Sequence, residues 1–351
     1  MMALMTQIEI PEKRRSEIKQ AVIKALKNGN IFYLPLKIKA IVRSFSNIRL
    51  IPFSKHMKKL NLSYDRVVKL VESKDACTDY YADNNLYYIY YNDIDKNITK
   101  SGRYRWNIAH ELGHILLRHH IDYEKTRVFR STLSDETYYM LEAEADYFAQ
   151  LILVPHAALI GFKIESYQNI RFMCEISGPA SKKRFYEYSK WKKHIDPNDA
   201  YDNQIFRLFY PFIFKKECRF CGASLIQRYG KYCPICGNQP LIWGEGKMQY
   251  KIRYNLNEKS RLRQCSVCEN ENIPEDAIYC QICGTPVQNK CTSCGKLANS
   301  DARYCIYCGS TTTFNSKVLP DWKEELEKEI HAENGFMNIP DAYGDEGLPF
   351  N

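Results

Sequence analysis

The stretch RYRWNIAHELGHILLRH, residues 103–119, contains the pattern HExxH within a run of apolar residues. These apolar residues cover most of the surface of a helix over residues 104–119, which predicts a buried helix. His110 and His114 are four residues apart and share one helical face, so both imidazoles can bind a single metal ion. Glu111 follows the first ligand and can act as general base on a water at the metal. The stretch therefore predicts a catalytic zinc site.

The residues around this pattern decide between a metal site and an ordinary helix. Histidines on the surface of an amphipathic helix are the competing interpretation, but the apolar flanks disfavour it. Polar side chains in a buried helix need a partner, and zinc supplies one for both histidines. His119 and His120, near the end of the same helix, are expected to interact with the helix dipole rather than bind metal.

A second predicted helix, residues 136–153, supplies the third ligand. Glu142 and Asp146 are four residues apart in the segment EAEAD, on one face beside small alanines that leave room for a metal. We expect Glu142 to bind the zinc ion and Asp146 to accept the free ring N–H of a ligand histidine. Glu144 is expected to face solvent, and it is the alternative third ligand.

Twelve cysteines form a second metal-binding pattern in the C-terminal half. They occur as six CxxC pairs, and two pairs ten or eleven residues apart can complete one tetrahedral zinc site. Three sites are expected, at Cys218, Cys221, Cys233 and Cys236, at Cys265, Cys268, Cys280 and Cys283, and at Cys291, Cys294, Cys305 and Cys308. These units resemble zinc ribbons, and the last two resemble a double zinc ribbon.

The cysteine count also bears on the redox compartment. Disulfides are the competing use of the pairs, but the N-terminus does not read as a secretion signal and a reducing compartment disfavours them. We expect three structural zinc ions, because such short units bury too little apolar surface to fold alone. Cys77 and Cys174 are expected to be buried thiols.

The remaining patterns indicate an α+β protein with a mainly helical first domain and a small sheet. Helices are predicted over residues 12–28, 63–71, 164–174, 179–193 and 322–331, and a strand over residues 86–91. The helices at 164–174 and 179–193 would form a helix-turn-helix. We expect a metallopeptidase domain at 1–195, a linker at 196–217, a zinc ribbon at 218–240, a β-rich connector at 241–264, a double zinc ribbon at 265–310 and an acidic tail at 311–351.

Charge does not identify a partner. The formal net charge is +9. Twelve thiolates with three zinc ions remove six charges and a fourth zinc adds two, so the charge falls to +5. Nucleic acid remains a possible partner through basic and aromatic residues, which are Lys182, Lys183, Arg184, Lys190, Lys192, Lys193, Arg228–Tyr232, Arg303 and Tyr304. A solvated basic face and ordinary ribbon surfaces are the alternatives. No apolar run is long enough to span a membrane, and we expect a cytoplasmic protein.

The first domain resembles the ImmA/IrrE family of metallo-endopeptidases. The resemblance rests on residues 105–117, on EAEADYFA at 142–149, on LVP at 153–155 and on ISGPA at 176–180 with Arg184, and it covers roughly residues 12–195. It implies a gluzincin-like site of His110, His114 and Glu142 with Glu111 catalytic. It also implies a protein substrate, a helix-turn-helix repressor whose cleavage derepresses mobile-element, phage or stress genes.

Two functions follow as hypotheses. In the first, the protein is a zinc-dependent endopeptidase; many tyrosines near the site could stabilise the oxyanion, and the sequence does not select one. In the second, the peptidase fold is a zinc-stabilised binding module without proteolytic activity, and the ribbons recognise nucleic acid or protein. The full set of catalytic residues favours the first, because a site that had lost its activity would be free to lose Glu111.

Overall fold

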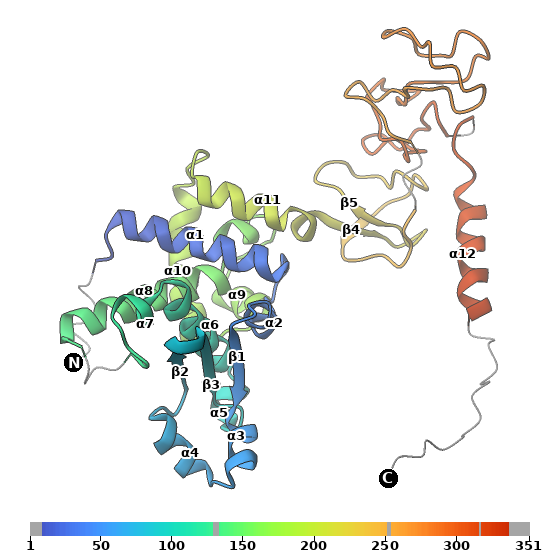
Figure 1. Ribbon diagram of the computed structural model, residues 1–351. Helices are drawn as coiled ribbons and strands as arrows, with labels where there is room; N and C mark the ends of the chain where they lie inside the picture. The colour runs from blue at the N-terminus through green and yellow to red at the C-terminus, as the bar shows by residue number, and fades with distance from the viewer. Residues whose placement is uncertain (1–8, 129–132, 251–253, 316, 337–351) are drawn as a thin grey trace, which may run out of the picture. The chain divides into compact units, whose positions relative to one another are not determined.

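A computed structural model of the protein describes residues 9–128, 133–250, 254–315 and 317–336 (Figure 1). The chain divides into two compact units between Ile213 and Phe214. The first unit is mainly helical and contains a small sheet, whereas the second contains three four-cysteine clusters with little regular structure. The predicted α+β fold class is confirmed.

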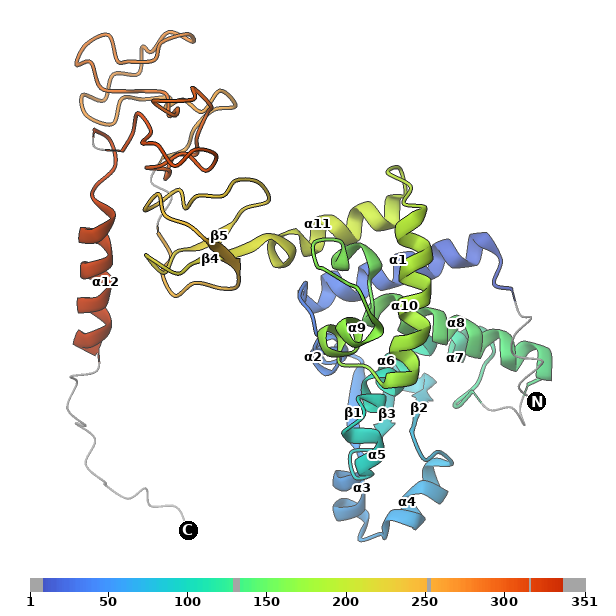
Figure 2. The same ribbon diagram turned by 180° about the vertical axis from the view of Figure 1, so that it is seen from behind.

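The first unit is mainly helical and is built around two helices that pack against each other. Its helices are α1 (Glu12–Gly29), α2 (Ile38–Arg43), α3 (Phe53–Leu60), α4 (Tyr64–Val71), α5 (Lys96–Thr99), α6 (Arg103–Leu116), α7 (His119–Asp122), α8 (Asp135–Leu153), α9 (Tyr167–Cys174), α10 (Gly178–Lys193) and α11 (Ala200–Phe214), with 3-10 turns η1 (Ala82–Asn84) and η3 (His156–Leu159). Figure 2 shows α9 and α10 side by side. The two helices contact each other, and residues 175–177 form the short connection between them.

A three-stranded sheet packs against α6. Its strands are β1 (Ile48–Pro52), β2 (Ala76–Tyr81) and β3 (Leu86–Tyr91), in the order β1-β3-β2. Strand β3 is parallel to β1 and antiparallel to β2, with Ile89 opposite Leu50 and Thr78. The predicted strand at 86–91 is therefore confirmed as the central strand, and β2 forms one edge of the sheet beside α6.

Helices α6 and α8 pack closely because small residues meet at their crossing. A Cβ atom at Gly113 would lie 3.2 Å from the Cα atom of Ala145 and 3.2 Å from the side chain of Phe148. Separations this short leave little room for any larger side chain at Gly113. The glycine of the HELGH segment thus allows the helix that carries Glu142 to approach the histidines.

Three predictions in this unit differ from the structure by more than one residue, and one of them is the start of α9, at Tyr167 rather than at residue 164. The helix expected over 104–119 ends at Leu116, and α7 begins at His119 after Arg118 adopts a left-handed conformation with φ of 65°. The segment 196–217, expected to be a linker, contains α11. This helix buries Tyr201, Ile205 and Phe209 because they recur at helical spacing, so residues 200–213 extend the core of the first unit, whereas residues 214–217 belong to the second unit.

The second unit is built from three ribbons, each named here by its cysteines: ribbon 1 (Cys218 to Cys236), ribbon 2 (Cys265 to Cys283) and ribbon 3 (Cys291 to Cys308). Ribbon 1 contains a sheet of order β5-β4-β6, with strands β4 (Lys215–Cys218), β5 (Ser224–Ile226) and β6 (Leu241–Trp243). Strand β6 begins the segment expected to be a connector, 241–264, and its pairing with β4 makes it part of ribbon 1.

The segment expected to be an acidic tail, 311–351, begins with residues that pair with ribbon 3. Thr311 and Thr312 form bridges to Tyr304 and Cys291, and Phe314 is fully buried against ribbon 2 residues. Helix α12 (Trp322–Phe336) contains the predicted helix at 322–331. Residues 337–351 lie outside the described part of the chain. Among the described residues, no helix is long and apolar enough to cross a bilayer.

Candidate metal centre and cysteine clusters

Helices α6 and α8 bring His110, His114 and Glu142 together. The Nε2 atoms of the two histidines are 3.0 Å apart, and each lies 3.4 Å from one carboxylate oxygen of Glu142. A tetrahedral zinc ion with ligand bonds of about 2.0 Å would separate its ligand atoms by about 3.3 Å. The three donor atoms therefore fit one zinc ion, and imidazole and carboxylate are ligands that zinc accepts.

Asp146 lies behind the first histidine. Its Oδ1 atom is 2.9 Å from Nδ1 of His110, so Nδ1–H can donate to the carboxylate while Nε2 stays free to bind metal. Burial acts to lower the pKa of His110, but hydrogen bonds to Asp146 and Glu142 outweigh it and raise the pKa well above its ordinary value. Burial acts to raise the pKa of Glu142, but hydrogen bonds to the two histidines outweigh burial and lower the pKa. The carboxylate is therefore ionised at neutral pH.

A chain of hydrogen bonds extends from the second histidine into the core. Nδ1 of His114 lies 2.8 Å from Nδ1 of His119, and Nε2 of His119 lies 2.9 Å from Glu144. Arg14 of α1 contacts the same carboxylate at 2.7 Å. If Nε2 of His114 binds metal, its Nδ1–H donates to His119, and the Nε2–H of His119 then donates to Glu144. This arrangement of ring protons gives one donor and one acceptor to the His114–His119 contact and to the His119–Glu144 contact.

The structure corrects two sequence-based expectations at this point. Glu144 was expected to face solvent, yet it is only 5% exposed, because α1 packs on α8 and brings Arg14 to its carboxylate. His119 and His120 were expected to act on a helix dipole, yet both are buried. His119 contacts His114, a candidate ligand, and His120 lies beside the rings of Tyr80 and Tyr87. Burial lowers the pKa of His120 to about 3.

Glu111 is held by the edge strand of the sheet. The hydroxyl of Thr78 on β2 donates to Oε2 of Glu111 at 2.7 Å. Thr78 was not anticipated as a site residue, since its role depends on the packing of β2 against α6. The hydroxyl occupies Oε2 and leaves the other carboxylate oxygen able to accept a second hydrogen bond.

These residues line a cleft of about 840 Å³. Its walls include His110, Glu111, Glu142 and Asp146 on the helices, Ala76–Thr78 on the edge strand, and Tyr138 on α8. Tyr138 is the one tyrosine among the described residues that line the cleft, one helical turn before Glu142. A cleft of this size accommodates several residues of a polypeptide.

The twelve paired cysteines form three clusters. Within each cluster, sulfur atoms from opposite CxxC pairs are 3.5–3.7 Å apart, whereas a disulfide would place them at about 2.0 Å. All 14 cysteines are free, including the buried Cys77 and Cys174. Zinc–sulfur bonds of about 2.3 Å imply sulfur separations of about 3.8 Å, so each cluster fits one zinc ion.

Several basic residues that were candidates for nucleic-acid contact are engaged within the protein. Arg303 is 2% exposed and contacts Glu325 at 2.7 Å. Arg184 is also buried, between Gln150 and Glu187. Lys182 and Lys190 lie over tyrosine rings on the surface of α9 and α10. The basic character of α10 is therefore confined to its lysines.

The fold and the two kinds of metal site define a class: a metallopeptidase-like domain with a His-His-Glu group, followed by four-cysteine ribbons. Comparison with known families agrees. Residues 78–171 match the IrrE N-terminal-like domain, and residues 265–309 match the double zinc ribbon. The chain thus combines an IrrE N-terminal-like domain with a double zinc ribbon, and ribbon 1 precedes the matched ribbons. A comparison with curated proteins finds no match.

Proposed function

We propose that the first unit is a zinc-dependent endopeptidase with Glu111 as its catalytic base. The observation that carries the proposal is the placement of Glu111 beside the His110, His114 and Glu142 group within one open cleft. A zinc ion held there would polarise a peptide carbonyl and lower the pKa of a water molecule. Ribbons 1 to 3 would each hold a structural zinc ion, which gives four per chain.

The residues of the chain account for the proton transfers. Glu111 takes a proton from the attacking water as the water oxygen bonds to the carbonyl carbon, and it delivers that proton to the leaving nitrogen as the C–N bond breaks. Thr78 fixes the orientation of the carboxylate throughout, through its hydrogen bond to Oε2. Tyr138 is the candidate donor to the oxyanion, since it lines the same cleft.

The edge strand supports a peptide as substrate. The backbone N–H of Tyr80 donates away from the sheet, to the carbonyl of Thr126. Because N–H groups alternate along a strand, those of Ala76 and Thr78 also point outward, into the cleft that these residues line. An extended peptide could therefore pair with β2 and present one of its bonds to Glu111. We infer a segment of extended polypeptide as the substrate class.

A helix-turn-helix repressor is the proposed protein substrate, and support for it comes from the sequence resemblance. Exposed loops or linkers of such a repressor would supply the extended segment. The alternative, a zinc-stabilised binding module without activity, has less support, since a binding module does not need Glu111 held at a metal site.

Coexpression with candidate repressors tests the proposal. Wild-type protein should produce discrete repressor fragments that disappear with Glu111→Gln, a change that keeps the side-chain shape but removes the base. Captured, uncleaved repressor should accumulate on the Glu111→Gln protein. Identical fragments from both proteins would contradict the proposal. Derepression that survives Glu111→Gln would favour the binding module.

A further inference from the structure

Ribbons 1 and 3 pack together through a reciprocal exchange of backbone hydrogen bonds. The N–H groups of Arg303 and Tyr304 in ribbon 3 donate to the carbonyl of Pro234 in ribbon 1, at 2.8 and 3.0 Å. In return, the N–H groups of Lys231 and Tyr232 in ribbon 1 donate to the carbonyl of Ile306 in ribbon 3, at 2.7 and 3.1 Å. In both ribbons these groups surround the first cysteine of the second CxxC pair. The two donor residues come directly before that cysteine, and the acceptor residue comes directly after it.

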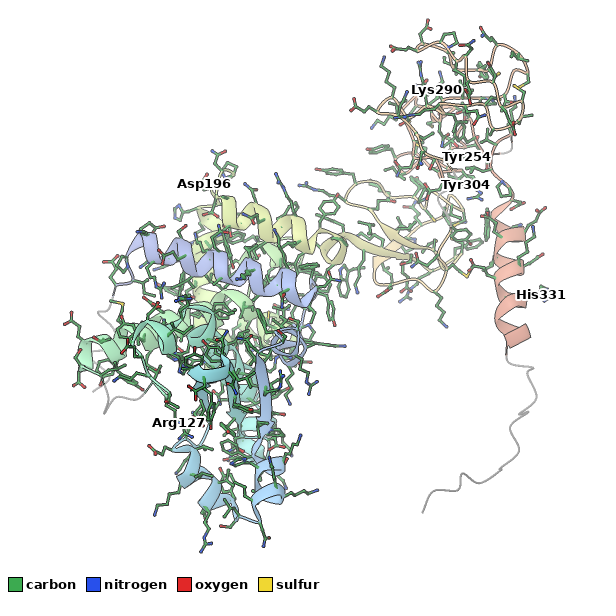
Figure 3. All side chains as sticks on the ribbon, in the orientation of Figure 1. Arg127, Asp196, Tyr254, Lys290, Tyr304 and His331 are labelled. Carbon is green, nitrogen blue, oxygen red and sulfur yellow. The ribbon has the colours of Figure 1, made fainter. Side chains whose placement is uncertain are left out.

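The side chains repeat this symmetry. The glycine after each second CxxC pair lies under the tyrosine of the other ribbon. A Cβ atom at Gly237 would lie 2.8 Å from the ring of Tyr304, and one at Gly309 would lie 2.8 Å from the ring of Tyr232. Figure 3 labels Tyr304 within this unit. Each ribbon therefore offers the same donor, acceptor and ring, so the two are related by an approximate two-fold axis.

Ribbon 2 has the corresponding tyrosine, acceptor residue and glycine, and within the described part of the chain no other ribbon packs on them. Tyr279 occupies the place of Tyr232 and Tyr304, and it is 51% exposed. Gln281 takes the place of Pro234 and Ile306 and is also exposed. Gly284 has a positive φ of 73°, close to the 75° of Gly237 and the 76° of Gly309, but a Cβ atom there would meet nothing within 4 Å.

The backbone of ribbon 2 is equally open at this face. Among the described residues, the N–H groups of Ile278 and Tyr279 and the carbonyl of Gln281 have no backbone hydrogen-bond partner. Open strand-like edges of this kind favour pairing with another chain. The apolar side chain of Ile282, next to Gln281, is exposed as well.

We propose that ribbon 2 is a dimerisation surface that pairs with ribbon 2 of a second copy of this chain. This face carries both the N–H donors and the carbonyl acceptor. A two-fold axis between two copies therefore brings the donors of each copy onto the acceptor of the other. The internal pair of ribbons 1 and 3 shows that two such faces fit. Because the face is small, the dimer should dissociate on dilution.

Sedimentation of the zinc-loaded full chain tests this proposal. The wild type should shift from monomer to dimer over about a hundredfold range of concentration. Tyr279→Ala removes the ring that would cover Gly284 and should weaken dimerisation at least about tenfold. The matched control is Val267→Ala, which shortens another exposed apolar side chain of ribbon 2, on its first CxxC pair rather than its second. Zinc content and thermal unfolding establish that both variants fold.

A photo-cross-linking amino acid at position 279 locates the contact. In a mixture of isotopically light and heavy chains, cross-links should join a light chain to residues 281–285 of a heavy chain. The same amino acid at position 304 should cross-link within one chain, to the region of Gly237. A monomer at every concentration would overturn the proposal, and so would a dimer that Tyr279→Ala leaves unchanged. Neither readout depends on peptidase activity.

Discussion

The ring of His119 supports the ring of His114: their Nδ1 atoms are 2.8 Å apart, and both side chains are buried. His119 in turn contacts Glu144, which Arg14 holds from a third helix. A carboxylate, that of Asp146, thus contacts His110 directly. At His114, the other candidate ligand, the imidazole of His119 lies between the ring and the carboxylate of Glu144. Contacts of this kind fix the tautomer and orientation of a metal ligand.

The contact between His119 and His114 predicts the effect of removing His119. His119→Ala should weaken zinc binding at the catalytic site by about 10- to 100-fold, because Nδ1–H of His114 loses its acceptor. Competition with a chromophoric chelator measures the affinity. Glu144→Gln should have a smaller effect in the same direction, since His119 remains. Unchanged affinity in His119→Ala, with the fold intact, would contradict this role.

Thr78 should affect turnover more than metal binding. Thr78→Val keeps the side-chain shape but removes the hydroxyl that donates to Glu111. We expect kcat to fall by about tenfold, with zinc content and KM nearly unchanged, because a poorly oriented base transfers protons less efficiently. Thr99→Val, whose hydroxyl contacts the carbonyl of Asp95, is a control outside the cleft. A Thr78→Val variant with full kcat would show that Glu111 does not need this contact.

Tyr138 and Tyr139 form a matched pair. Tyr138 lines the cleft and Tyr139 does not, although the two are adjacent on α8. If Tyr138 donates to the oxyanion, Tyr138→Phe should lower kcat by about 10- to 100-fold, whereas Tyr139→Phe should change it little. Steady-state kinetics on one cleaved peptide distinguishes them. Equal effects of the two substitutions would remove Tyr138 from the mechanism.

His156 makes stability depend on pH. Burial and the nearby charge of Arg184 lower its pKa to about 4, from an ordinary value of 6.5. The unfolded chain therefore binds a proton more readily, and this contribution to stability is present above pH 6.5 and is lost as the pH falls towards 4. Between about pH 7 and about pH 5 the loss should be about 2 kcal/mol.

The variant His156→Phe separates this contribution from other titrating groups. Phenylalanine can keep the ring contacts with Tyr188 and Trp191 but does not titrate. Urea unfolding followed by tryptophan fluorescence should give a smaller loss of unfolding free energy on acidification than in the wild type. Parallel pH dependence in the two proteins would show that His156 is not the group responsible.

The sequence indicates some parts of the site better than others. HExxH and the segment at Glu142 lie on regular helices, where a spacing of four residues places side chains on one face. The contacts of His119, Glu144 and Arg14 depend on the docking of three helices, and no local pattern encodes them. Thr78 was missed for the same reason. The short strands β1 and β2 lack a clear apolar alternation, so only β3 was predicted.

The remaining differences have local causes. The turn-forming residues Asp196–Asp199 suggested a linker, but the apolar residues after them recur at helical spacing and pack as α11. The CxxC spacing predicted three four-cysteine clusters, and the structure contains them. The cysteine spacing does not predict that ribbon 1 packs on ribbon 3. This packing depends on backbone hydrogen bonds between the ribbons and not on the cysteines.

Peptide hydrolysis by matched zinc-loaded proteins tests the central claim most directly. Wild type and Glu111→Gln should be purified with equal zinc content at the His110, His114 and Glu142 group and incubated with a peptide library. The account predicts internal cleavage by the wild type and a loss of at least about a thousandfold in kcat/KM for Glu111→Gln. Equal cleavage by the two proteins would contradict the account. So would a fully zinc-loaded wild type that cleaves neither the peptides nor coexpressed repressors.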